Sequence, residues 1–260
     1  MIEYITGFIA GWFVVPNIWG LGLAVLFGAL WLAGYKPPLL RKPWLWAVMV
    51  VSAFLTLAAV ALVQIPLQAL AGQLLGRFWS QEVLMQWLLL AGIPQILLSG
   101  LVQEGAKMVP MVFWWWRSGR NLNPRLGLAI GVVAGAGFGI YEAVWVHNQI
   151  FASGWTWQAV QVTGLLALAG FWERFFTVAF HIAVSGLAGY GLARGWGWQF
   201  YLLASFLHGL LNYSAVLLQV KVFTIVHVET YAAVIALLVT AAALWLRWKG
   251  SAEDEAIGAA

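Results

Sequence analysis

Long apolar stretches alternate with short turns that carry proline and basic residues, and this pattern predicts membrane-spanning helices. A helix of about 20 apolar residues crosses the hydrocarbon layer of a bilayer. Seven stretches approach or exceed this length, at 8–34, 44–71, 93–116, 126–147, 173–193, 198–219 and 230–246. Two further pieces, 83–91 and 157–171, are expected to lie at the interface or to re-enter the membrane. The sequence therefore predicts an all-α polytopic bundle, with residues 1–249 as a single domain.

The two ends of the chain are expected to add little to this bundle. The start, Met1-Ile2-Glu3, lacks the basic residues of a cleavable signal, so we expect the first apolar stretch to remain in the mature protein. Residues 250–260 are acidic and too few to fold alone, so a short disordered tail is expected there.

Composition narrows the class of protein. Hydrophobic residues make up 63% of the chain and charged residues 8%, whereas about 25% of the residues of an ordinary soluble domain are charged. This excludes a soluble globular enzyme. The chain has no cysteine, which excludes disulfides, thiolate nucleophiles and metal sites with cysteine ligands.

The basic residues predict the orientation, because short cytoplasmic loops carry an excess of Lys and Arg. Most of them fall in turns on one side of the predicted membrane: Lys36, Arg41, Lys42, Arg117, Arg120, Arg125, Arg194, Arg247 and Lys249. Only Arg77 and Lys221 fall on the other side. We therefore expect an integral protein of a prokaryotic plasma membrane, surrounded by lipid, with its amino terminus outside and its carboxyl terminus in the cytoplasm. Basic residues spread over several short turns do not indicate a nucleic-acid partner.

Ionisable residues and histidines are concentrated in the third to sixth spans. They are Glu104, Lys107, Glu142, Glu173, Arg174, His181 and His208. A charged group near the bilayer centre costs roughly 3 kcal/mol if it is unpaired, so these side chains should face one another or water. The interiors of the first two spans carry no charge. The polar groups therefore mark one half of the bundle.

Spacing indicates which polar groups can meet. Three pairs each lie on one helix face: Glu104 with Lys107, Arg174 with His181, and His208 with Asn212. At about 1.5 Å per residue, two carboxylates, Glu104 and Glu142, and both imidazoles reach similar depths, between the midplane and the outer face. His147 and His227 lie near the outer interface, and we assign them no role.

The fourth span carries a stripe of small residues. Glycine recurs every four residues, at Gly127, Gly131, Gly135 and Gly139. Such a stripe lets the backbone of a neighbouring helix approach closely, so we interpret it as a packing surface. Phe138 and Glu142, also four apart, lie beside the stripe.

Four segments resemble the PrsW and YhfC families of intramembrane proteases, which are relatives of the CAAX-processing and bacteriocin-processing membrane proteases. The segments are Gln103-Glu104-Gly105-Ala106-Lys107; Gly137-Phe138 running to Glu142-Ala143; Glu173-Arg174 running to His181 and Ser185-Gly186; and His208-Gly209-Leu210-Leu211-Asn212. They cover residues 103–212, a little under half of the chain. Each motif alone is weak, but together their order and spacing are specific.

The resemblance implies cleavage of a peptide bond in or beside the membrane segment of a partner protein. Water would be activated by a carboxylate and an imidazole, with His208 and Asn212 steadying the oxyanion. The residue types suit two schemes. Glu142, His181 and His208 could hold a zinc ion with one open position, or a glutamate could take the proton from water directly. The site would be reached from outside or laterally from lipid.

One position departs from the family pattern. The first motif normally begins with two glutamates, and Gln103 replaces the first of them. A carboxamide cannot act as a general base, so the base would be Glu104 or Glu142. Otherwise the chain is an inactive relative that binds helices without cutting them.

Other interpretations remain open from the sequence alone. The Glu104–Lys107 and Glu173–Arg174 pairs could be local ion pairs, and the two buried histidines could be hydrogen-bonded packing residues. The same ionisable groups would also suit a proton-coupled transporter. A membrane subunit with a histidine as axial ligand to a tetrapyrrole is a third class.

Overall fold

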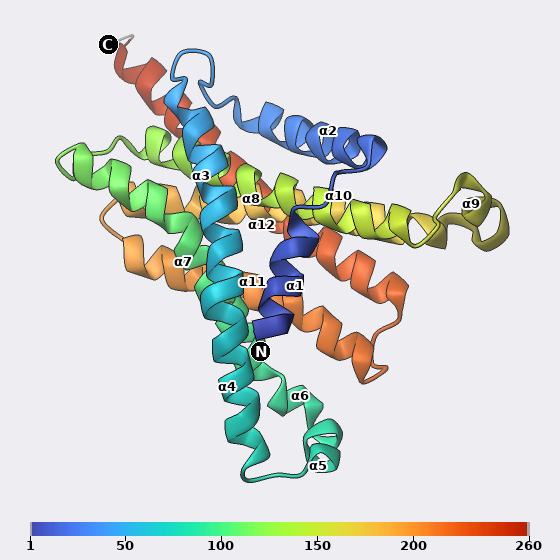
Figure 1. Ribbon diagram of the computed structural model, residues 1–260. Coiled ribbons are helices and arrows are strands. Elements are labelled where there is room, and N and C mark those ends of the chain that lie inside the picture. The colour runs from blue at the N-terminus through green and yellow to red at the C-terminus, as the bar shows by residue number, and fades with distance from the viewer. Residues whose placement is uncertain (1, 259–260) are drawn as a thin grey trace.

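The structure, a computed structural model, describes residues 2–258 and is built of helices joined by short turns (Figure 1). In chain order the helices are α1 (Ile2–Trp12), α2 (Ile18–Tyr35), α3 (Trp44–Ala59), the π-helical turn η1 (Val60–Gln64), α4 (Ile65–Gly76), α5 (Gln81–Gln86), α6 (Leu88–Ala91), α7 (Ile93–Arg117), α8 (Pro124–Ala152), α9 (Trp157–Thr163), the 3₁₀ turn η2 (Gly164–Leu168), α10 (Ala169–Ala193), α11 (Gly197–Gln219) and α12 (Ile225–Gly258).

Seven segments of the described chain are long and apolar enough to cross a membrane. They are Ile18–Tyr35, Trp44–Gly76, Leu88–Arg117, Pro124–Ala152, Trp157–Ala193, Gly197–Gln219 and Ile225–Lys249. The predicted class, an all-α polytopic membrane bundle with seven spans, is confirmed.

The predicted start of the first span is wrong. The stretch 8–34 is broken between α1 and α2, so the span begins at Ile18. Pro16 lies in the break; it lacks an N–H group and disfavours helical geometry in the residue before it. Asn17 is the N-cap of α2: its side chain accepts hydrogen bonds from the backbone N–H groups of Trp19 and Gly20.

The two additional segments are short helices. The piece 83–91 becomes α5 and α6, separated at Trp87, and 157–171 becomes α9, η2 and the first residues of α10. At the other end, α12 runs through Gly258 and so extends into 250–260, the segment predicted as a disordered tail.

The glycine stripe of α8 is a packing surface, as predicted, and its partner is α10. The stripe meets the α10 backbone at three levels: Gly127 at Gly189, Gly131 at Ser185 and Gly135 at His181. A Cβ atom at any of these glycines would collide with a carbonyl oxygen of α10. The close approach therefore fixes His181 beside the face of α8 that carries Phe138 and Glu142.

A second close approach joins α7 to α11. Gly100 of α7 lies against the backbone of Ser205, so that a Cβ atom at Gly100 would collide with the Ser205 carbonyl oxygen. One helical turn further along each helix stand Glu104 and His208. Glycine packing thus brings the polar positions of four helices toward one another.

Candidate functional site

The Glu104 carboxylate on α7 accepts two short hydrogen bonds inside the bundle. The Lys107 Nζ atom lies 2.5 Å from Glu104 Oε1, and the His208 Nδ1 atom lies 2.6 Å from the same oxygen. Glu104 is 1% exposed and Lys107 is fully buried. Because the carboxylate only accepts, His208 donates through Nδ1–H, and its Nε2 carries the ring's lone pair.

His181 on α10 links this group to α8. Its Nδ1 atom lies 3.1 Å from Lys107 Nζ, and its Nε2 atom lies 3.2 Å from Glu142 Oε2. An ammonium group only donates, so Nδ1 accepts and Nε2–H donates to Glu142. The Phe138 ring packs edge-on against the imidazole, with ring centroids 5.2 Å apart.

Arg174 completes the network at the other side of Glu142. Its Nη1 atom donates to Glu142 Oε2 over 2.9 Å, and the guanidinium also binds both oxygens of Glu173. The result is one unbroken chain of polar contacts: His208, Glu104, Lys107, His181, Glu142, Arg174 and Glu173. Opposite charges alternate with the imidazoles along it, which is what burial away from water requires.

A cavity of about 640 Å³ lies beside this chain. Both histidines and Asn212 line it, whereas Glu104 and Lys107 are not among its lining residues. Its lining includes the end of α11 and the start of α12. The Asn212 side chain donates to Ser99 Oγ over 3.0 Å. The two imidazoles and the Asn212 amide therefore line the cavity, and the buried Glu104–Lys107 ion pair lies behind the imidazoles.

Three side chains of the described chain are placed to hold a metal ion. Single ligand atoms of Glu104, His181 and His208 all lie within 4.8 Å of one another. The structure thus groups the two histidines with Glu104, whereas the sequence interpretation groups them with Glu142. The Glu142 carboxylate bonds to His181 Nε2 and to Arg174 instead. Its pairing with Arg174 draws it to the other side of the imidazole.

The residues present fit a divalent metal by donor type. Two imidazoles and one carboxylate, with a position left for water, are the ligands of many catalytic zinc sites. Lys107 Nζ already contacts Glu104 Oε1 and His181 Nδ1. Two of the three candidate metal-binding atoms, Glu104 Oε1 and His181 Nδ1, therefore already direct lone pairs toward the positive charge of Lys107.

Gln103 lies on the cavity wall in an amide network that the sequence interpretation missed. Its Nε2 atom donates to Gln64 Oε1 over 3.1 Å. Nearby, Gln68 and Gln95 each donate from the side chain to the other's backbone carbonyl, over 2.8 and 3.0 Å. The available signal was the presence of amides within apolar spans. The network holds α4 and η1 against α7.

Glu229 is a second residue that the sequence interpretation missed. It lines the cavity from α12, and its Oε2 atom is buried without a hydrogen-bond partner among the described residues. The available signal was one acidic residue directly before the predicted span 230–246. His147 and His227, which were given no role, do not line the cavity: His147 bonds to the Gly20 carbonyl and His227 to Thr224.

Fold and site together define a polytopic membrane protein with a secluded carboxylate and imidazole centre. The chain belongs to the PrsW family of intramembrane metalloproteases, whose family model matches residues 41–243. The match includes every residue of the polar chain, and the resemblance seen in the sequence is confirmed. No curated protein and no solved structure matches this chain. At family level, the function is proteolysis within the membrane.

Proposed function

We propose that this protein hydrolyses a peptide bond in the transmembrane or juxtamembrane segment of a partner protein, at the cavity wall formed by His181, His208 and Asn212. The observation that carries the proposal is the convergence of Glu104 and both histidines, with ligand atoms within 4.8 Å of one another. Convergence beside a cavity is the geometry that water activation needs.

His208 is the residue best placed to take a proton from water. Its Nδ1–H donates to Glu104, which leaves the Nε2 lone pair available on a ring that lines the cavity. Lys107 balances the charge of Glu104, and Glu104 in turn would stabilise the imidazolium that forms on His208. This carboxylate and imidazole pair works as in hydrolases that hold a histidine through its Nδ1–H.

Asn212 supplies a hydrogen-bond donor on the same wall. It stands one helical turn after His208, and its amide donates to Ser99 Oγ, an exchangeable hydroxyl partner. A substrate carbonyl that develops negative charge could take this hydrogen bond over.

In the alternative, metal-dependent scheme, Glu104, His181 and His208 would hold the metal that the family description implies, and His208 would then be a ligand instead of the base. A divalent ion such as zinc, bound there, would polarise a peptide carbonyl and make a water molecule more acidic. Glu142 orients His181 from behind through the Nε2–H bond, and Arg174 fixes Glu142. Carboxylates commonly orient metal-binding imidazoles in this way.

The basic end of the protein is proposed to face the cytoplasm, so that the cavity is reached from outside or laterally from lipid. The chain lacks cysteine, so single cysteines report sidedness cleanly. Ser153→Cys and Ser118→Cys replace exposed serines that follow α8 and α7. An impermeant maleimide added to intact cells should label Ser153→Cys only; labelling of Ser118→Cys only would reverse the orientation.

The proposed activity is tested by mapping new protein amino termini in membranes from cells that produce the protein or its Glu104→Gln variant. We expect the wild type to generate termini within or beside membrane spans of other proteins, and Glu104→Gln to abolish them. His227→Gln, at an exposed histidine outside the cavity, is the matched control and should retain them. Identical termini with wild type and Glu104→Gln would show an inactive relative, as the Gln103 substitution allows.

A further inference from the structure

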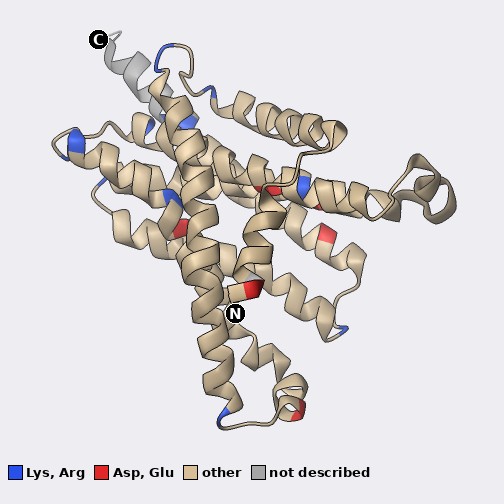
Figure 2. Cartoon of the chain, viewed as in Figure 1, with Lys and Arg blue, Asp and Glu red and all other residues tan. Residues whose placement is uncertain are grey.

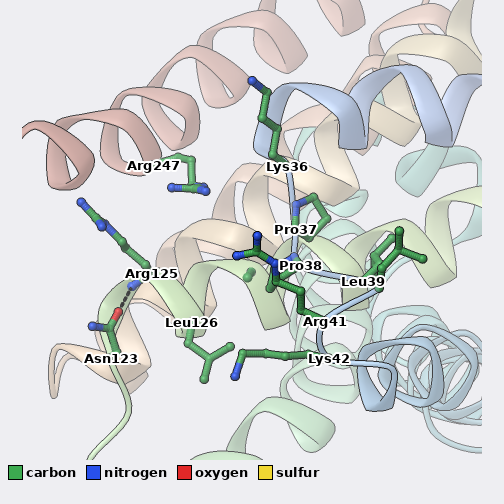
Figure 3. Close-up of a pocket in the computed structure, with 12 residues that line it drawn as sticks. Lys36, Pro37, Pro38, Leu39, Arg41, Lys42, Asn123, Arg125, Leu126 and Arg247 are labelled. Carbon is green, nitrogen blue, oxygen red and sulfur yellow. Dashed lines mark hydrogen bonds between the residues drawn. The ribbon is translucent and has the colours of Figure 1, made fainter.

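A second large cavity, of about 850 Å³, lies at the basic end of the protein and shares no lining residue with the cavity beside the proposed centre (Figure 3). Figure 2 shows the same end, where α2 and α12 run toward α3 and α8 and where many of the Lys and Arg residues gather. Five basic side chains line the cavity: Lys36, Arg41, Lys42, Arg125 and Arg247. No acidic residue is among its lining residues.

Three separate segments contribute these charges. The α2–α3 turn supplies Lys36, Arg41 and Lys42, the start of α8 supplies Arg125, and the end of α12 supplies Arg247. The amino terminus of the long helix α8 adds the positive end of its dipole. Positive charge from distant parts of the sequence therefore converges on one space.

Part of this arrangement depends on a strained backbone conformation at Lys36. Lys36 ends α2 with φ 48°, in the left-handed region where glycine is the usual residue. Arg247 is positioned by a hydrogen bond from its Nε to the Tyr35 carbonyl, over 2.9 Å. A bound anion would help to offset this strain.

The depth of the cavity indicates which anion it meets. It lies where spans end at Tyr35 and Lys249 and begin at Trp44 and Pro124, which is the level of lipid headgroups. Lys36 Nζ lies 5.2 Å from the ring centroid of Trp248, a residue type typical of that level. The rest of the lining is Asn123 and six apolar residues: Pro37, Pro38, Leu39, Leu40, Leu126 and Ala129.

We propose that this cavity binds the phosphate group of an anionic phospholipid, with the basic side chains around the phosphate and the apolar lining along the glycerol and upper acyl region. The proposal is independent of the proteolytic centre. Juxtamembrane basic clusters attract anionic lipid in this way.

The experiment measures lipid retention by the purified full-length protein in detergent, using native mass spectrometry with phosphatidylglycerol or phosphatidylcholine. We expect phosphatidylglycerol to be retained preferentially. The double variant Arg41→Gln/Lys42→Gln should weaken its binding roughly 25-fold, at about fivefold per basic group. The matched control, Arg117→Gln/Arg194→Gln, removes two charges from the same end outside the cavity and should bind as wild type does.

A competition with inorganic phosphate and a further variant test whether the bound anion is a lipid and whether a loss of binding reflects a loss of folding. If inorganic phosphate at equal concentration displaces phosphatidylglycerol fully, the site takes a free anion and the lipid proposal fails. Equal retention of both lipids, or equal losses in the two double variants, would also overturn it. Lys36→Gly removes a charge and relieves the left-handed strain, so it should lower lipid retention without lowering the unfolding temperature; unchanged retention would contradict the proposal.

Discussion

The two large cavities of this protein handle charge in opposite ways. Beside the inner cavity, Glu104, Lys107 and His181 are almost fully buried, and every charge of the polar chain touches an opposite charge or an imidazole. At the basic end, partly or fully exposed residues of one sign share a space. Burial demands pairing, because an unpaired charge loses its hydration, whereas contact with water permits accumulation of one sign. The inner group should therefore respond strongly to the loss of one member, and the outer group weakly.

The largest effect is expected from Lys107→Met. This variant leaves the Glu104 carboxylate buried without its cation, which should lower the free energy of unfolding by about 3 to 5 kcal/mol. Chemical unfolding in detergent micelles measures the change. Lys249→Met, at an exposed residue, is the matched control and should shift stability by less than about 0.5 kcal/mol.

The double variant Glu104→Gln/Lys107→Met sharpens the same comparison. It removes both charges, so part of the lost stability should return. A double variant less stable than Lys107→Met would show that the pair is not the source of the loss.

A smaller effect is expected from Arg174→Met. Arg174 binds Glu142 and Glu173, whose side chains are 22% and 30% exposed, so water can partly replace the lost contacts. Loss of charged hydrogen bonds of this kind costs about 1.5 to 3 kcal/mol. Unfolding curves of the variant should show a loss below that of Lys107→Met; an equal or larger loss would contradict the ranking by burial.

Gly135→Ala tests the packing that places His181. The added methyl group would collide with the His181 carbonyl, which should cost about 1 to 3 kcal/mol. Gly22→Ala on α2, with no atom within 4 Å of the added Cβ, should be neutral or slightly stabilising. Equal stability of the two variants in thermal unfolding would show that α8 and α10 are not locked at this point.

The smallest effect on stability belongs to the basic end. Arg41→Gln removes one exposed member of a same-sign group, so unfolding in detergent without lipid should change by less than about 0.5 kcal/mol. A loss comparable to that of Lys107→Met would remove the contrast between the two cavities.

The number of spans and the location of the polar groups could be predicted from the sequence. Apolar length defines spans, and the cost of an unpaired charge in lipid requires Glu104, Glu142, His181 and His208 to meet. The structure brings them into one network. The role of the glycine stripe was also predictable, because glycine every four residues has few uses other than close helix packing.

Other features depend on information that spacing does not hold. Residue spacing gives depth along a helix but not the rotation of one helix against another, so it could not show that Glu104, rather than Glu142, groups with both histidines. The π-helical turn η1, which ends at Gln64, changes the register of the second span and brings an amide to Gln103. Pro66, just after the turn, lacks the N–H group that a continuous α-helix needs there, so the sequence signals an irregularity in this span but not its π-helical form.

The most direct test of the central claim, that Glu104 and His208 act as one hydrolytic unit, is the rate of formation of the mapped amino termini in Glu104→Gln, His208→Gln and the double variant. When two residues act as one catalytic unit, replacing both lowers the rate little more than replacing either one. Each single variant should lose at least about a hundredfold in rate, and the double variant should lose no more than either. Losses that multiply, or a single variant that keeps its activity, would contradict the account.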